Sequence, residues 1–174
     1  MKQLTISNAR SFAIERFKSL PELQSGWNIV HSEAIIKMLD VLCEGNKEKL
    51  SALAWVHDIG KTVGEENHAE LSIKILKEEF ELDETDIDCI TNHGSSGKPK
   101  TEEGKIFRYA DGLSLFCKES ADFRFYAEAK EGLSKKQIMD EISKSYAKYK
   151  EKYADSEKVI NLLENLFSEI NQAV

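Results

Sequence analysis

The stretch Ala54-Trp-Val-His57-Asp58-Ile-Gly60-Lys61 places a histidine and an aspartate side by side at the end of an apolar segment. Neighbouring side chains on a regular helix point about 100° apart, so both reach one centre only where the helix ends. Gly60 suits a turn at this point, because glycine tolerates a positive φ. We therefore expect a helix from about Lys47 to His57, followed by a turn that aims His57 and Asp58 at a common point.

Outside this stretch, apolar residues recur at helical spacing and strand-like alternation is scarce. The pattern predicts an all-α fold, a single bundle of about eight or nine helices. The clearest helices are expected at about 8–20, 28–45, 47–57, 68–76, 84–93 and 102–119. Two or three more fill the C-terminal part, where 156–170 is in helical register. Loops are expected at 21–27, 60–64 and 94–100. Side chains of Asn67, Thr101 and Ser134 are expected to cap helices, and Gly45 is expected to follow a helix end.

The length of 174 residues suits one domain with its own core. We expect a single domain over 1–174, with a motif-bearing core at about 25–117 and C-terminal helices at about 123–172 packed on it. No apolar run of about eighteen residues predicts a membrane span, and the first residues do not resemble a signal peptide. Three widely spaced cysteines, Cys43, Cys89 and Cys117, form no CxxC pair, which favours buried thiols in a reducing cytoplasm.

The formal net charge of −7 disfavours binding to duplex nucleic acid, because the protein repels phosphates on average. A small phosphorylated ligand is still compatible with this charge, since bound metal cations invert the local field. The lysine-rich segment 135–158 also carries acidic residues, and we interpret it as a solvated helical face.

All four histidines, His31, His57, His68 and His93, fall in the first 93 residues, and three share a helical face with apolar neighbours. A single histidine on such a face is more often a core residue than a ligand. Four together favour a shared purpose, because each buried ring needs partners for two nitrogens. Asp111 lies in an apolar stretch, where a lone carboxylate is costly unless it is paired or bound to a cation.

The order of these residues resembles the HD-domain superfamily of metal-dependent phosphohydrolases. Its elements here are Asn28-Ile-Val-His31-Ser, the HDIGK form at His57-Asp58-Ile-Gly-Lys61, His68-Ala-Glu-Leu-Ser72, Ile90-Thr-Asn-His93 and Tyr109-Ala-Asp111-Gly-Leu113. The resemblance spans about residues 25–117 and implies a helical metallohydrolase.

The resemblance also implies the ligands: His31, His57, Asp58 and Asp111 for a first metal, and His68 and His93 for a second, with Asp58 bridging. Imidazole and carboxylate ligands suit Fe, Mn, Zn, Co or Ni, and Mg is a further candidate. Two such ions would clamp a phosphate and activate a water for in-line attack. Lys61 is expected to neutralise phosphate charge, and Ser95, Ser96 and Lys98 to contact the substrate.

The expected substrate is a nucleotide or dinucleotide; a nucleoside monophosphate or a cyclic phosphodiester is an alternative. The loop after His93 lacks the tyrosine of the GYP-type motif, which speaks against cleavage of cyclic dinucleotides. The bacterial diadenosine-tetraphosphate hydrolases of the HD type resemble the chain better. Two other readings are open: a sensor module that binds metal or nucleotide without turnover, and a metal-free bundle with structural histidines. The sequence leaves the oligomeric state undecided.

Overall fold

The structure is a computed structural model that describes residues 1–45, 47–94 and 96–173. These residues form nine α-helices: α1 (Ile6–Phe17), α2 (Glu22–Leu42), α3 (Lys47–Val56), α4 (His68–Leu76), α5 (Glu84–Asn92), α6 (Glu102–Ser114), α7 (Lys118–Lys130), α8 (Lys135–Lys152) and α9 (Glu157–Ala173). A 3-10 helix, η1 (Ile59–Thr62), follows α3, and two short strands, β1 (Lys2–Gln3) and β2 (Phe80–Glu81), pair in parallel. The prediction of an all-α fold is confirmed. Within the described residues, no helix is both long and apolar enough to span a bilayer.

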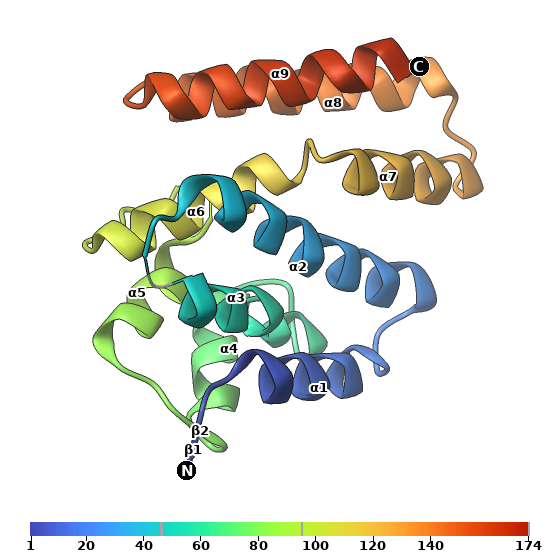
Figure 1. The fold of residues 1–174 in the computed structure, drawn as a ribbon. Coiled ribbons are helices and arrows are strands. Elements are labelled where there is room, and N and C mark those ends of the chain that lie inside the picture. Colours follow the sequence, from blue (N-terminus) through green and yellow to red (C-terminus); the bar gives the residue numbers. More distant parts are fainter. Residues whose placement is uncertain (46, 95, 174) are drawn as a thin grey trace.

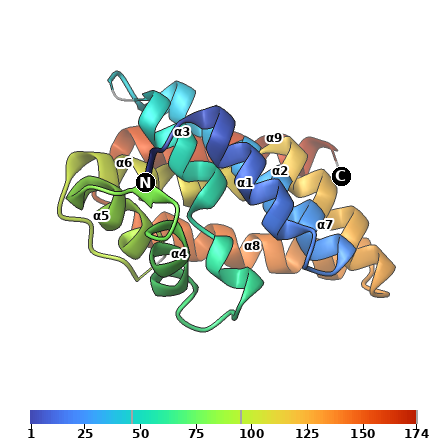
Figure 2. The same cartoon turned by 90° about the horizontal axis from the view of Figure 1, so that it is seen from below.

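Helix α2 packs against α3, α6 and α7, which makes it the centre of the arrangement. Helix α1 packs on α3, α4 on η1, and α5 on α6. Helices α8 and α9 lie together as a layer at the top of the molecule in Figure 1, next to α6 and α7. Figure 2, the view from below, shows this layer behind the other helices.

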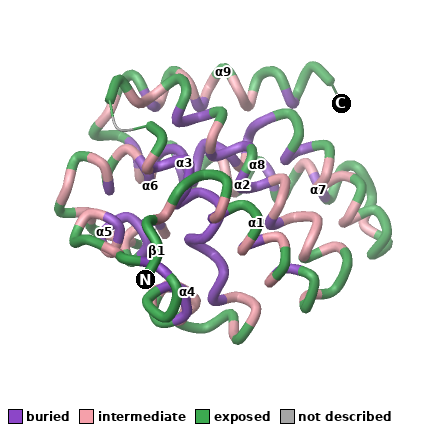
Figure 3. Tube along the Cα trace, turned by 60° about the horizontal axis from the view of Figure 1, so that its bottom comes forward, coloured by how far each residue is buried: buried purple, intermediate pink, exposed green. Residues whose placement is uncertain are grey.

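Helix α3 is the most deeply placed helix, with every residue from Leu50 to Val56 buried. Figure 3 shows the buried colour running through α3 in the middle of the trace. Because α3 is apolar on all sides, neighbouring helices must surround it. The backbone that leaves α3 at His57 therefore starts inside the protein, so polar groups placed there are shielded from water.

Two of the predicted caps are confirmed. Thr101 accepts a hydrogen bond from the Gly104 amide at the start of α6, and Ser134 forms a capping box with Gln137 at the start of α8. The predicted cap at Asn67 is wrong in mechanism: Asn67 precedes α4, but its backbone is left-handed (φ 58°) and its side chain makes no capping bond.

Several predicted boundaries are wrong. Residues 22–27 belong to α2 rather than to a loop, because Pro21 begins the helix instead of separating two elements. Helix α2 ends at Leu42, three residues before the expected end near Gly45, so Gly45 does not follow the helix directly. Helix α6 ends at Ser114 rather than at 119: residues 115–117 form a turn, and Lys118 and Glu119 begin α7.

Gly60 is needed for close packing, not for the positive φ that the sequence suggested. A Cβ atom at Gly60 would lie 2.0 Å from the carbonyl oxygen of His68 and 2.7 Å from the Ser72 amide. The Gly60 amide also donates to the buried Ser72 hydroxyl at 2.8 Å. The glycine thus lets η1 lie directly against the first turn of α4.

The C-terminal layer meets the core at a second glycine. A Cβ atom at Gly112 would lie 1.9 Å from the hydroxyl oxygen of Tyr153, which donates to the Arg108 carbonyl at 2.8 Å. The hydroxyl of Tyr109 donates to Asp155 at 3.0 Å. The residues that follow α8 therefore pack directly on residues 108–112 of α6, and one of the contacted residues, Gly112, is next to Asp111.

We predict that Gly60→Ala lowers the free energy of unfolding by about 2 kcal/mol or more, because the new methyl group overlaps α4 backbone that cannot move aside cheaply. Chemical denaturation measures this. Gly64→Ala is the matched control: its Cβ would lie 3.7 Å from the nearest atom, Leu71 Cδ1, so a loss below about 1 kcal/mol is expected. Equal losses in the two variants would contradict the packing argument.

Candidate metal centre

The six predicted ligands come from four helices and the turn between α3 and η1. His31 lies in α2, His57 and Asp58 between α3 and η1, His68 at the start of α4, His93 at the end of α5, and Asp111 in α6. All are buried except His68, whose side chain is 29% exposed. The helix ends at His57 and His93 turn these side chains inward, as the sequence suggested.

Each histidine ring is held through its Nδ1 atom. In three of them Nδ1 lies against a backbone carbonyl three residues earlier: Ala54 for His57 (3.0 Å), Glu65 for His68 (3.0 Å) and Ile90 for His93 (2.6 Å). A carbonyl can only accept, so each neutral ring carries its proton on Nδ1 and leaves a lone pair on Nε2. This is the orientation that metal-binding histidines require.

His31 is oriented by a side chain instead. Its Nδ1 atom lies 3.0 Å from the Ser114 hydroxyl, which donates its own proton to the Asp111 carbonyl at 2.6 Å. The hydroxyl therefore accepts from Nδ1, and the Nε2 lone pair of His31 is again left for another partner. Sequence reasoning missed Ser114, although its position three residues after Asp111 on one helix was a usable signal.

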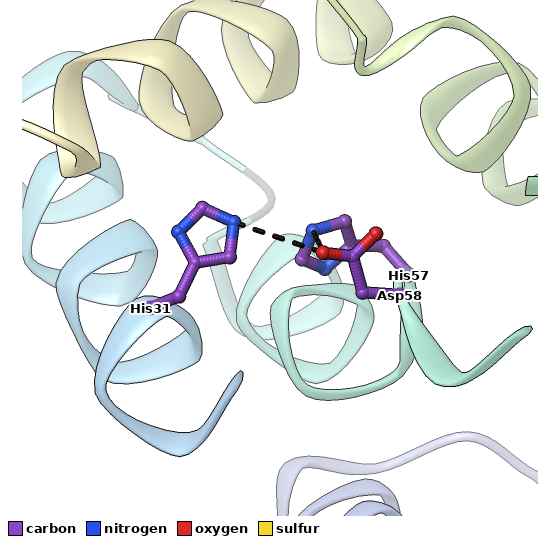
Figure 4. Close-up of side chains that lie close together, drawn as sticks. All are labelled: His31, His57 and Asp58. Carbon is purple, nitrogen blue, oxygen red and sulfur yellow. Dashed lines mark ion pairs between the residues drawn. The ribbon is translucent and has the colours of Figure 1, made fainter. Parts of the chain in front are cut away.

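The Nε2 atoms converge on the two carboxylates. One group of possible ligands comprises His31, His57 and Asp58, whose ligand atoms lie within 4.8 Å of one another (Figure 4). Asp111 borders this group: its Oδ1 atom lies 3.0 Å from His31 Nε2 and 3.7 Å from His57 Nε2. The structure thus brings together the four residues expected around a first metal.

A second group comprises Asp58, His68 and His93. Asp58 Oδ1 lies 3.3 Å from His68 Nε2 and 3.5 Å from His93 Nε2, while Oδ2 faces His57 Nε2 at 3.4 Å. The two Nε2 atoms of His68 and His93 are 3.2 Å apart. Each oxygen of Asp58 therefore faces a different set of imidazoles, which is the arrangement a bridging carboxylate needs.

A divalent cation fits these residues. His57 Nε2 and Asp58 Oδ1 are fully buried and have no hydrogen-bond partner among the described residues. A buried polar atom without a partner costs free energy, so each such atom calls for an explanation. A cation shared by imidazole nitrogens and carboxylate oxygens would satisfy both atoms, and this donor set suits borderline transition metals.

The electrostatics of the site point the same way. Burial opposes the charge on Asp58, but His57, His93 and Lys61 outweigh it and hold the pKa of this carboxyl well below its ordinary value. Burial also works against a proton on His93, yet Asp58 and Asp111 raise its pKa to about 9. Burial lowers the pKa of His57. The site is thus built around carboxylates that stay charged and attract cations.

Lys61 lies at the edge of this cluster. Its Nζ atom is 2.5 Å from Asp58 Oδ2, and its side chain is 21% exposed. Burial opposes its charge, but Asp58 outweighs this and raises the Lys61 pKa, so the ammonium stays protonated. A cation that reaches both the ligand cluster and solvent is placed to meet an anionic substrate.

The other residues predicted to contact the substrate are Ser95, Ser96 and Lys98. Among the described residues, no hydrogen bond or ion pair links Ser96 or Lys98 to the ligand cluster. Ser96 and Lys98 are exposed in the segment that follows His93, and Ser95 lies outside the described residues. The Lys98 amide donates to Asn92 Oδ1 at 3.1 Å. Their predicted contacts with substrate therefore stay predictions.

Asp88 fixes this segment to α5, a role that sequence reasoning missed. Its Oδ2 atom accepts from the amides of Lys100 (2.9 Å) and Thr101 (2.8 Å) and from the Thr101 hydroxyl (2.7 Å), and its Oδ1 atom accepts from Asn92. A Cβ atom at Gly97 would lie 2.1 Å from the Asn92 carbonyl oxygen. The segment is thus folded back on the helix end that presents His93.

Comparison with protein-family models finds one match, the HD domain, over residues 28–115. The chain belongs to the HD-domain family. The match runs from the turn of α2 before His31 to the residue after Ser114, so it contains all six predicted ligands and the serine that orients His31. No curated protein and no solved structure matches the chain.

Membership of the HD-domain family and the buried His/Asp clusters together indicate a metal-dependent phosphohydrolase. They bear out the family resemblance read from the sequence. The matched range ends before α7, so the last three helices, α7 to α9, lie outside the region shared with the family.

Asp58→Ala is expected to remove both metal ions, because Asp58 is common to the two groups, whereas His68→Ala is expected to reduce binding from two ions per chain to one. Metal analysis after loading with Mn²⁺ measures this. Glu70→Ala, on the exposed side of α4, is the control and should bind as the parent protein does. Two ions per chain in the His68 variant would contradict the assignment of His68 to a second ion.

Proposed function

We propose that the protein hydrolyses a phosphoester or phosphoanhydride bond of a nucleotide or dinucleotide. The observation that supports this most directly is the pair of ligand groups joined by Asp58, with Lys61 beside them. Two adjoining cation sites suit phosphate oxygens better than any neutral substrate. The proposal takes His31, His57, Asp58, His68, His93 and Asp111 as the metal ligands.

Divalent cations bound here would supply Lewis acidity, which activates water and neutralises phosphate charge. The chain's own residues have two further tasks around such cations. The Nδ1 contacts of the histidines fix the direction of each ligand atom, so that little reorganisation is needed during the reaction. Burial of Asp58 and Asp111 excludes water that would weaken their interactions with the cations.

Lys61 is proposed to hold a phosphate oxygen during the reaction. In the structure its ammonium group is paired with Asp58 Oδ2. Cations held by Asp58 would compete with Lys61 for this carboxylate, and the Lys61 ammonium could then pair with a phosphate oxygen of the substrate instead. A fixed positive charge aimed at the phosphate stabilises the additional negative charge of the transition state.

A second candidate function is a module that binds metal and nucleotide without turnover. It uses the same ligands, and the exposed side of His68 shows that the cluster is not sealed from solvent. Both functions need access of this kind, because each must admit a nucleotide, so the two are separated by measured turnover.

The test of the proposal is phosphate release from a panel of nucleotides and dinucleotides with Mn²⁺, Fe²⁺, Co²⁺ or Mg²⁺. Activity is expected with at least one ion, and it should disappear with a chelator and in Asp58→Ala. Metal-loaded protein that binds nucleotides but releases no phosphate from any of them would support the sensor module and overturn the proposal.

Lys61→Gln is expected to lower kcat by about 100-fold while metal content stays unchanged, because Lys61 acts on the phosphate and is not a ligand. Single-turnover kinetics together with metal analysis separate the two effects. Lys74→Gln, an exposed lysine of α4 outside the cluster, is the matched control and should keep the activity of the parent protein. A Lys61 variant that loses metal in proportion to activity would show that the lysine only maintains the ligand site.

A further inference from the structure

Next to the metal centre, α2 and α7 enclose a hollow of about 300 Å³ that the hydrolytic chemistry does not use. Its apolar walls include Leu23 and Trp27 from α2, Phe123 and Ala127 from α7, and Leu115 between α6 and α7. Its charged lining residues are Arg124, Glu128 and Glu131. Figure 2 shows α7 running alongside α2. This volume is at the lower end of those that hold small organic molecules.

Trp27 lies between the hollow and the metal centre and contacts both. The indole stacks on the imidazole of His31, with ring centroids 5.7 Å apart and planes 9° from parallel, and it also lines the hollow. Leu115, on another wall, directly follows Ser114, whose hydroxyl holds His31 Nδ1. A molecule in the hollow is therefore one aromatic ring away from a predicted metal ligand.

The second aromatic wall is brought in by a glycine. The rings of Phe123 and Trp27 lie 6.1 Å apart at 48°, and a Cβ atom at Gly26 would lie 2.9 Å from the Phe123 ring. Any larger residue at position 26 would push Phe123 away from α2. Two aromatic rings at an angle form a slot that suits a flat aromatic ligand, because such rings attract one another face to face and edge to face.

The charged members give the slot a donor and an acceptor. Arg124 Nε donates to Glu128 Oε1, while Glu128 Oε2 is fully buried and has no hydrogen-bond partner among the described residues. A buried carboxylate oxygen without a partner is costly, and a small rotation of the Glu128 side chain, which lines the hollow, would bring this oxygen to a ligand N–H group and remove the cost. A nucleobase edge offers such N–H groups beside acceptor atoms that the arginine can meet.

We propose that this hollow binds the purine base of the nucleotide whose phosphate lies at the metal centre. The inference rests on the proposed function, because it assumes that the phosphate of a nucleotide binds at the metal centre. The base stacks against Trp27 and Phe123, and its N–H edge donates to Glu128. A purine is favoured over a pyrimidine because its larger ring system covers more of the two aromatic walls.

The binding test uses metal-free protein and the nucleosides adenosine, guanosine and uridine, so it does not depend on hydrolysis. The chain has two tryptophans, and Trp55 is 2% exposed in the core, away from the hollow's lining residues. In an NMR titration, the Trp27 indole N–H signal, assigned with Trp27→Phe, should shift with purine nucleosides more than with uridine, while the Trp55 signal stays in place.

Two variants then probe the slot without touching His31. Glu128→Gln keeps an oxygen for Arg124 but replaces the acceptor by a donor, and Ala127→Leu fills the hollow. Each should weaken purine nucleoside binding by at least about tenfold. Glu141→Gln is the matched control, since this exposed residue of α8 pairs with Lys144 at 2.6 Å. Melting curves of all three variants confirm that they fold.

The kinetic test compares purine nucleoside monophosphates with ribose 5-phosphate, which carries no base. The two variants should raise KM for the nucleotides by at least about tenfold and leave the values for ribose 5-phosphate unchanged. Purine binding that is unchanged in both variants overturns the base site, even if phosphate is released. Purine binding that depends on Glu128 without release of phosphate supports the base site and overturns the hydrolase.

Discussion

The structure depends on the burial of one carboxylate, that of Asp58, at the point where four imidazoles meet. A buried charge is unfavourable unless opposite charges or ligating groups surround it. Here each oxygen faces its own imidazoles, and the neighbouring groups keep the carboxyl ionised. The remaining features of the core follow from the need to bring these groups to one place and to hold them there.

Holding the imidazoles in place is a task of the backbone. Because His57, His68 and His93 each use a carbonyl three residues earlier, the helix ends themselves set the ring directions. Gly60 then allows η1 and α4 to approach until His68 reaches the other side of Asp58. The geometry of the site therefore depends on the close backbone packing at Gly60, because a larger residue there would move His68 away from Asp58.

The helices outside the family match add contacts on two sides of this core. Tyr153, directly after α8, rests on Gly112, next to Asp111, and α7 lies along α2 near His31. The first contact is made by the residue next to Asp111, and the second by Trp27, whose ring stacks on His31. Helices outside the family match can therefore add a binding surface beside the metal centre. The hollow beside Trp27, lined in part by α7, is the clearest example.

The sequence by itself determined the helical class, the family and the six residues that the structure brings together, because helical periodicity and motif order are local properties of the chain. It mistook the start of α2, the role of Gly60 and the capping at Asn67, since each depends on contacts with other segments. Ser114, Asp88 and the Trp27 hollow emerged only from the tertiary structure. Their partners are distant in the chain or on another helix, and no pattern along the sequence encodes a distance in space.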